Sequence, residues 1–335
     1  MPRLRGFEEY GMEIVNLGRH GLKVSRLCLG TMVFGAQCDE PASVAVMDAA
    51  ADLGFNFFDL ADVYPVPPDP KTAGTTEEIV GRWLEGRRQG FVIATKFNGP
   101  MGPGPNDRGA SRKHIVEACE ASLRRLQTDR IDVYYIHHFD DSSPLDETME
   151  AFDRLHADGK ILYVGISNFA AWQLGLAQAI IAEGRLAPIA ALEPRYNLLF
   201  RQPERDLLPL ANALGIGVMP YNPLGAGMLT GKYRRGSQPP PESRFGWGDY
   251  GQMYQGRYWS DEMFEVVDAL VEVAREESVT PAQAALAWML TRDSITSPIV
   301  GASRPDQLQE TVKALDIRLS AGAVAKLDEA SSTFL

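Results

Sequence analysis

The sequence is poor in cysteine and lacks any long apolar stretch. Its three cysteines, Cys28, Cys38 and Cys119, are odd in number and do not have the spacing of metal ligands. No apolar run approaches the ~18 residues of a membrane-spanning helix, and residues 1–10 lack the hydrophobic region of a signal peptide. We therefore predict a soluble, cytoplasmic protein that holds no metal.

Positive charge is also scarce. The chain has 33 lysine and arginine residues against 44 aspartate and glutamate residues, which gives a net charge of −11 at pH 7. This imbalance disfavours nucleic acids and anionic membranes as partners, because both attract basic surfaces. A small molecule is then the expected partner, and the sequence leaves open whether identical copies associate into a homo-oligomer.

Apolar runs are short but numerous, and helical patterns separate them. Most are continuously apolar, as expected for parallel strands buried on both faces. The eight runs cover residues 25–31, 55–60, 91–95, 131–137, 161–167, 190–196, 217–221 and 297–300. Eight strands that each lead to a helix are typical of a (β/α)8 barrel, which needs ~250 residues or more. We predict an α/β fold of the TIM-barrel type, a single domain over residues 1–335, with an N-terminal β-hairpin over residues 13–24 that plugs the barrel bottom.

Capping residues mark several helix starts. Ser111 precedes one apolar stripe, Ser143 with Pro144 opens a second, and Thr280 with Gln283 forms a capping box before a third. Long loops over residues 64–76, 98–110 and 224–260 all follow strands. Such loops gather at the carboxyl ends of barrel strands, where active sites lie. We read residues 224–260 as the longest irregular stretch.

Four polar residues stand at the downstream ends of three consecutive strands. Asp59 and Tyr64 follow the second strand, Lys96 ends the third and His137 ends the fourth. Reduction of a carbonyl by hydride needs a proton donor beside the oxygen. A neighbouring ammonium lowers the pKa of a tyrosine, a carboxylate keeps the ammonium charged, and an imidazole orients the carbonyl. The four residues supply that set.

Each residue also has a simpler interpretation. Taken alone, Lys96 is compatible with a surface lysine and Asp59 with a carboxylate that caps a loop. His137 has a rival in His138, and either suits a buried structural histidine. Because all four fall at the same end of neighbouring strands, we favour the proton-delivery site.

The ordered motifs make the chain similar to the aldo-keto reductase family. The matching segments are residues 58–61 with Tyr64, 95–96, 131–137, 165–169, 196–199, 223–232 and 299–302. The resemblance implies that Tyr64 is the acid/base, that Lys96 and Asp59 tune it, and that His137 orients the carbonyl. The loop after Tyr64 resembles that of a bacterial subgroup in which it is lengthened.

The resemblance also implies a nicotinamide cofactor, NADPH (NADP+), across the barrel mouth. Ser167 and Asn168 would hold the carboxamide, Tyr221 would stack on the ring, and Arg304 would read the adenosine 2′-phosphate. The implied contacts are Ser167, Asn168, Glu193, Tyr221, Leu224, Gly225, Gly227, Leu229, Gly301, Ser303, Arg304, Gln307 and Glu310. Glu193 departs from the glutamine common in the family. An ionised glutamate accepts hydrogen bonds but cannot donate them, so we expect an effect on cofactor affinity and none on the four catalytic residues.

The function implied is NADPH-dependent reduction of aldehyde or ketone carbonyls to alcohols. The alternative is a cofactor-binding regulatory or scaffold subunit, as among relatives attached to membrane channels. Retention of all four catalytic residues favours the enzyme. A glycoside hydrolase that uses Asp59 and a second acid would leave Lys96 without a role. Aromatic residues in the loops either line the mouth for apolar substrates or anchor the longest loop.

Overall fold

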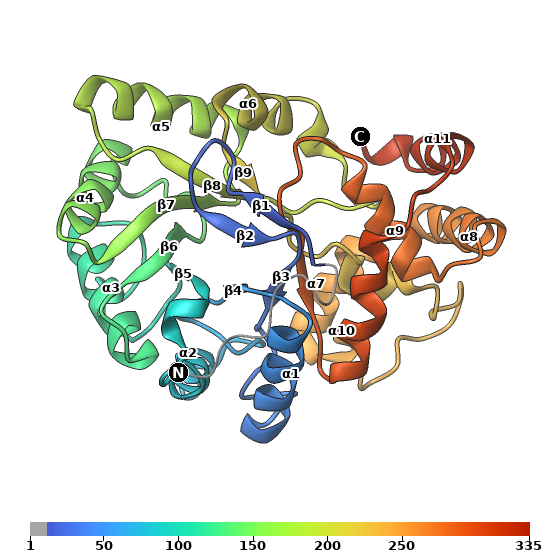
Figure 1. Cartoon of the computed structure of the whole chain (residues 1–335), viewed down its shortest axis with the longest axis horizontal. Coiled ribbons are helices and arrows are strands. Elements are labelled where there is room, and N and C mark those ends of the chain that lie inside the picture. Colours follow the sequence, from blue (N-terminus) through green and yellow to red (C-terminus); the bar gives the residue numbers. More distant parts are fainter. Residues whose placement is uncertain (1–11) are drawn as a thin grey trace.

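A barrel of eight parallel strands forms the centre of the computed structural model, which describes residues 12–335 (Figure 1). The strands are β3 (Cys28–Gly30), β4 (Phe57–Asp59), β5 (Val92–Phe97), β6 (Ile131–Ile136), β7 (Ile161–Ser167), β8 (Ile189–Glu193), β9 (Gly217–Val218) and β10 (Ile299–Gly301). They are ordered β10-β3-β4-β5-β6-β7-β8-β9 in the sheet. The amide of Ile299 donates to the carbonyl of Pro220 at 2.9 Å, which connects β10 with the segment after β9. The predicted (β/α)8 barrel is confirmed.

The predicted N-terminal hairpin is also present. Strands β1 (Ile14–Asn16) and β2 (Lys23–Ser25) pair antiparallel, so Ser25 belongs to the hairpin and not to the first barrel strand. Gly18 at the turn has a φ of 56°, and a Cβ there would lie 2.3 Å from the carbonyl oxygen of Gly215. Only glycine allows this close approach of the hairpin to the barrel end.

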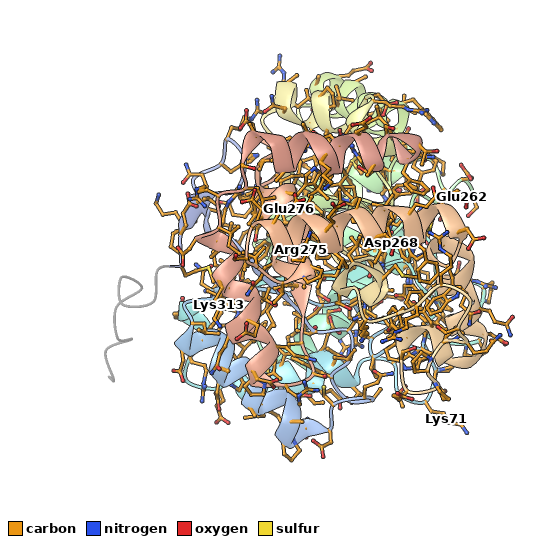
Figure 2. The ribbon with its side chains drawn as sticks, turned by 90° about the vertical axis from the view of Figure 1, so that its right-hand side faces the viewer. Lys71, Glu262, Asp268, Arg275, Glu276 and Lys313 are labelled. Atoms are coloured by element: carbon orange, nitrogen blue, oxygen red, sulfur yellow. The ribbon has the colours of Figure 1, made fainter. Side chains whose placement is uncertain are left out.

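Helices surround the barrel, as Figure 1 shows. They are α1 (Glu40–Asp52), α2 (Thr75–Trp83), α3 (Arg112–Leu126), α4 (Leu145–Ala157), α5 (Ala171–Gly184), α6 (Leu207–Leu214), α7 (Gly248–Tyr258), α8 (Asp261–Glu276), α9 (Pro281–Leu290), α10 (Pro305–Val312) and α11 (Ala321–Ala330). The exposed face of α8 carries charged side chains, among them Asp268 and Arg275 (Figure 2). None of the helices within residues 12–335 combines the length and the apolar character needed to span a membrane.

Two of the three predicted caps are confirmed. The hydroxyls of Ser111 and Thr280 accept hydrogen bonds from the first turns of α3 and α9. The prediction for Ser143 was wrong, because α4 begins at Leu145 with Pro144 as its N-cap. Ser143 instead donates its hydroxyl hydrogen to Asp140 Oδ2 at 2.8 Å. The Asp140 carboxylate holds this hydroxyl, so Ser143 does not cap α4.

The long stretch over residues 224–260 is less irregular than predicted, because it contains α7. The glycines of α7 conceal this helix in the sequence, yet Gly251 is required: a Cβ there would lie 2.6 Å from the carbonyl oxygen of Phe245. Phe245, Tyr254 and Tyr258 are buried. These three aromatic side chains therefore anchor the loop over the barrel.

Apolar side chains fill the barrel interior up to the strand ends. The interior cluster includes Phe57, Ala94, Tyr135 and Ala191 from four strands, and Met219 directly after β9. Beyond them, towards the carboxyl ends of the strands, the interior becomes polar, with Asp59, Lys96 and Glu193 all buried. This polar layer begins the candidate site.

Candidate active site

Lys96 is the buried centre of the site and not a surface lysine. Its side chain is 0% exposed, and its Nζ lies 2.7 and 2.6 Å from the two carboxylate oxygens of Asp59. A third hydrogen bond of 2.8 Å goes from Nζ to the carbonyl oxygen of Leu60. The parallel register of β4 and β5 sets the two side chains side by side, with Asp59 opposite Ala94. Burial of a charge needs such a partner.

Tyr64 and His137 lie beside this pair. The Nζ of Lys96 is 5.4 Å from the centroid of the Tyr64 ring. The rings of Tyr64 and His137 meet edge to face, with centroids 6.1 Å apart. The His137 ring in turn stacks on His138 at 4.8 Å. The structure thus brings together the four residues predicted to be catalytic, at the carboxyl ends of the strands.

The protonation states suit a proton donor. Burial raises the pKa of the Tyr64 phenol above its ordinary value, while Lys96 acts in the opposite direction. We predicted the Lys96 effect, but burial outweighs it, so Tyr64 keeps its proton at neutral pH. Burial alone would lower the pKa of Lys96, but the carboxylates of Asp59 and Glu193 raise it overall. Burial and then Lys96 hold the pKa of His137 well below its ordinary value, so the imidazole is neutral.

A hydrogen-bonded chain joins His137 to the residues predicted to hold the nicotinamide. The side-chain amide of Asn168 donates to the carbonyl oxygen of His137 at 2.9 Å. The Tyr221 hydroxyl donates to Asn168 Oδ1 at 2.7 Å, and the Ser167 hydroxyl donates to the carbonyl oxygen of Glu193 at 3.0 Å. Asn168 has a φ of 57°, a left-handed conformation that asparagine tolerates.

Glu193 lies closer to the catalytic group than the sequence indicated. It is buried at the end of β8, and its Oε2 is 3.3 Å from Lys96 Nζ. The expectation that this substitution leaves the four catalytic residues unaffected was wrong. The sequence allowed only a comparison of Glu193 with the glutamine common in the family. The curvature of the barrel brings Glu193 of β8 to Lys96 of β5 across the barrel interior.

The remaining predicted contacts lie on two segments of the barrel rim. Leu224 precedes the helical turn Gly225–Thr230, in which Gly225 and Gly227 have φ values of 54° and 97°. Left-handed residues in succession direct backbone amides to one side, which suits anionic oxygens. The second segment begins at the last residue of β10 and includes Gly301, Ser303, Arg304, Gln307 and Glu310. There the amide of Ser303 donates to Gln307 Oε1 at 2.7 Å, and Arg304 is exposed.

Arg244 is a rim residue that sequence reasoning missed. Its guanidinium donates to Asn222 Oδ1 at 3.3 Å, and a Cβ on Gly301 would lie 3.8 Å from its Nη2. Arg244 therefore stands between the two segments predicted to bind the cofactor. Two cationic side chains, Arg244 and Arg304, and the left-handed backbone make this rim compatible with a dinucleotide phosphate. The proline-rich sequence around Arg244 has no hydrophobic periodicity that would indicate where its side chain lies.

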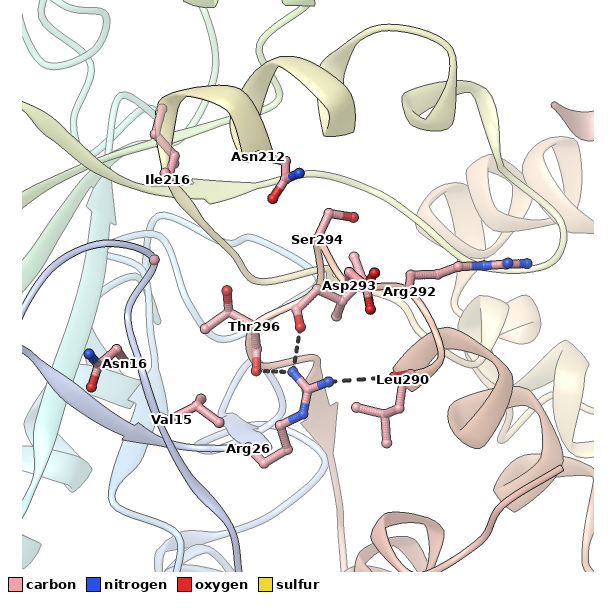
Figure 3. A pocket seen from close by; sticks show the side chains of 13 residues that line it. Val15, Asn16, Arg26, Asn212, Ile216, Leu290, Arg292, Asp293, Ser294 and Thr296 are labelled. Carbon is pink, nitrogen blue, oxygen red and sulfur yellow. Dashed lines mark hydrogen bonds between the residues drawn. The ribbon is translucent and has the colours of Figure 1, made fainter.

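A separate cavity of about 410 Å³ lies at the opposite end of the barrel (Figure 3). The hairpin and the segment before β10 line it, and it contains none of the four catalytic candidates. Arg26 donates there to the carbonyl oxygens of Ile295, Thr296 and Leu290. Its guanidinium is thus occupied in closing the barrel bottom, which is a structural role.

Comparisons with known proteins agree with this geometry. The sequence pattern of the Aldo/keto reductase family matches residues 26–332. The chain is 39% identical over 325 residues to "Uncharacterized oxidoreductase YrpG" of Bacillus subtilis, covering 95% of each chain. It is 41% identical over 314 residues to "Probable voltage-gated potassium channel subunit beta" of Arabidopsis thaliana, covering 91% of this chain and 92% of the relative. "L-glyceraldehyde 3-phosphate reductase" of Escherichia coli is 34% identical over 333 residues, with 96% and 93% covered.

Proposed function

We propose, from the premise that this chain belongs to the aldo/keto reductase family, that it reduces aldehyde or ketone carbonyls to alcohols with NADPH. The observation that carries the proposal is the buried Asp59–Lys96 pair directly beside Tyr64 and His137. An ammonium, a protonated phenol and a neutral imidazole at the carboxyl ends of neighbouring strands provide what carbonyl reduction needs from the protein.

In this reaction the bound nicotinamide supplies the hydride. Tyr64 gives its phenolic proton to the substrate oxygen as negative charge develops there. Lys96 stabilises the phenolate that remains, because its charge lies 5.4 Å from the ring. Asp59 keeps Lys96 charged and aimed through two short contacts. The neutral His137 offers a ring nitrogen that orients the carbonyl oxygen.

The residues proposed to hold the cofactor divide into two groups. Ser167, Asn168 and Tyr221 lie on the hydrogen-bonded chain that reaches His137, so they suit the nicotinamide end. Arg304 lies at the start of α10, where its planar fork suits the adenosine 2′-phosphate. In the structure Arg304 pairs with Asp306 at 3.2 Å. A phosphate would compete with this exposed carboxylate.

A regulatory subunit is the second candidate, and the similarity to the Arabidopsis thaliana channel subunit beta favours it. Both candidates bind the same cofactor, so cofactor binding does not separate them. The complete set of Asp59, Tyr64, Lys96 and His137 favours the enzyme, because a scaffold has no use for a proton donor.

Consumption of NADPH tests the proposal directly. We would follow its absorbance with a panel of aldehydes, ketones and quinones, and repeat the panel with NADH. Steady oxidation of NADPH by at least one carbonyl, with alcohol as product, is the expected result. Binding of NADPH without turnover on any carbonyl would favour the regulatory subunit instead.

A further inference from the structure

Two carboxylates share one buried ammonium in the barrel interior. The side chains of Asp59, Lys96 and Glu193 are 5%, 0% and 4% exposed, and each lies at or next to the end of a different strand. Lys96 Nζ has three hydrogens, and three acceptors lie within 2.8 Å of it: both oxygens of Asp59 and the carbonyl of Leu60. No hydrogen of Lys96 remains for Glu193. Accordingly, Glu193 Oε2 is buried and has no hydrogen-bond partner.

The charge of this cluster does not balance if both acids are ionised. One ammonium and two carboxylates leave a net negative charge among three buried side chains. Among residues 12–335, Lys96 is the one cation paired with either carboxylate. The other titratable groups that face Glu193 carry no positive charge; they are Cys28, Tyr64, Tyr135 and Tyr221. A buried pair of like charges is relieved when one of them takes a proton.

The contacts indicate which acid takes the proton. Asp59 meets Lys96 through both oxygens at 2.6 and 2.7 Å, whereas Glu193 approaches with one oxygen at 3.3 Å. Burial and then the negative charge of Asp59 raise the pKa of Glu193 well above its ordinary value. Burial raises the pKa of Asp59 as well, but the charge of Lys96 opposes the increase there. Because Lys96 holds both oxygens of Asp59, Glu193 is the acid expected to carry the proton.

We infer that Glu193 is a neutral carboxylic acid at neutral pH, and that it positions the Asp59–Lys96 pair beneath Tyr64. Its proton lets it donate to Asp59, so the pair keeps its geometry without a second negative charge. An ionised Glu193 would oppose Lys96 at the phenol of Tyr64, because its charge raises the pKa of that phenol. This last consequence rests on the proposed function, whereas the protonation state of Glu193 does not.

Infrared spectroscopy of the protein without cofactor or substrate tests the inference. A protonated carboxyl absorbs apart from a carboxylate, and carbon-13 in the side-chain carboxyl shifts the band. At pH 7 we expect a protonated-carboxyl band that shifts when glutamate is labelled and disappears in Glu193→Gln. The isosteric amide keeps the fold, which circular dichroism would verify.

Asp62 offers a matched control. It is fully buried, neither of its carboxylate oxygens has a partner, and burial raises its pKa well above the ordinary value. Asp62→Asn should remove a band that shifts on aspartate labelling and leave the glutamate band in place. Absence of a glutamate band in the parent protein, or its persistence in Glu193→Gln, would overturn the inference.

A kinetic readout separates positioning from a purely structural role. As pH rises, ionisation of Glu193 should lower turnover in the parent protein. This decrease at alkaline pH should be absent from the pH profile of Glu193→Gln. A variant with an unchanged pH profile would contradict the positioning role. Because the infrared experiment needs neither NADPH nor a carbonyl, its failure and a failure of the proposed function are distinguishable.

Discussion

Substitution of Glu193 by glutamine should stabilise the protein, by an amount that grows with pH. In the folded state the pKa of Glu193 is raised well above its ordinary value, first by burial and then by Asp59. Unfolded, the same carboxyl ionises near its reference pKa of about 4.3. The folded state therefore binds one more proton between these two pKa values, and stability falls as pH rises through that window. Glutamine does not titrate, so the free energy of unfolding of the variant does not fall with pH through this group.

The size of this stabilisation follows from the linkage between proton binding and folding. One proton of difference between the folded and unfolded states changes the free energy of unfolding by about 1.4 kcal/mol per pH unit. Between pH 5 and pH 7 the variant should therefore gain about 3 kcal/mol relative to the parent protein. Below the unfolded pKa the two proteins should differ little through this group, because Glu193 is then protonated in both states.

Urea denaturation at pH 5, 6 and 7 measures the gain. The midpoints of the parent and of Glu193→Gln should separate as pH rises, with the slope of the free energy against urea unchanged. Glu265 is exposed on α8, so Glu265→Gln serves as a control that should follow the parent at every pH. A gap between parent and Glu193→Gln that stays constant across the three pH values would refute a neutral Glu193.

Three further substitutions test other parts of the site and its frame. Lys96→Met should lower turnover by a factor on the order of 10² or more, because Tyr64 loses the neighbouring charge; parent-like steady-state rates would exclude this role. Arg304→Ala should weaken NADPH binding more than NADH binding in fluorescence titrations, whereas equal losses would show that Arg304 does not contact the 2′-phosphate. Gly251→Ala should destabilise the protein by about 1–3 kcal/mol, since the new Cβ would lie 2.6 Å from the Phe245 carbonyl oxygen; an unchanged melting temperature would contradict this packing.

The barrel was predictable because its strands are continuous apolar runs between capped helices. The grouping of Asp59, Lys96 and His137 followed from the same pattern, since parallel strands end at one edge. Tyr64 needed only a short loop to join them. These predictions depend on local sequence and on one topological rule, which is why they hold.

Contacts between distant strands were less accessible from the sequence. Glu193 lies far along the chain from Lys96, and only closure of the barrel reveals that they meet at 3.3 Å. Arg244 lies in a proline-rich stretch where no periodicity indicates which way a side chain points. The glycines of α7 hide a helix whose course is set by packing on Phe245. In each case tertiary contacts decide what the local sequence leaves open.

The proton-donor role of Tyr64 is tested most directly by Tyr64→Phe with the best carbonyl substrate from the panel. Turnover should fall by a factor on the order of 10² or more while NADPH binding is retained, because only the phenolic proton is removed. Tyr163→Phe is the matched control, since Tyr163 contacts His20 of the hairpin with ring centroids 5.7 Å apart and lies away from the site. Near-normal turnover in Tyr64→Phe would contradict the assignment of Tyr64 as the proton donor.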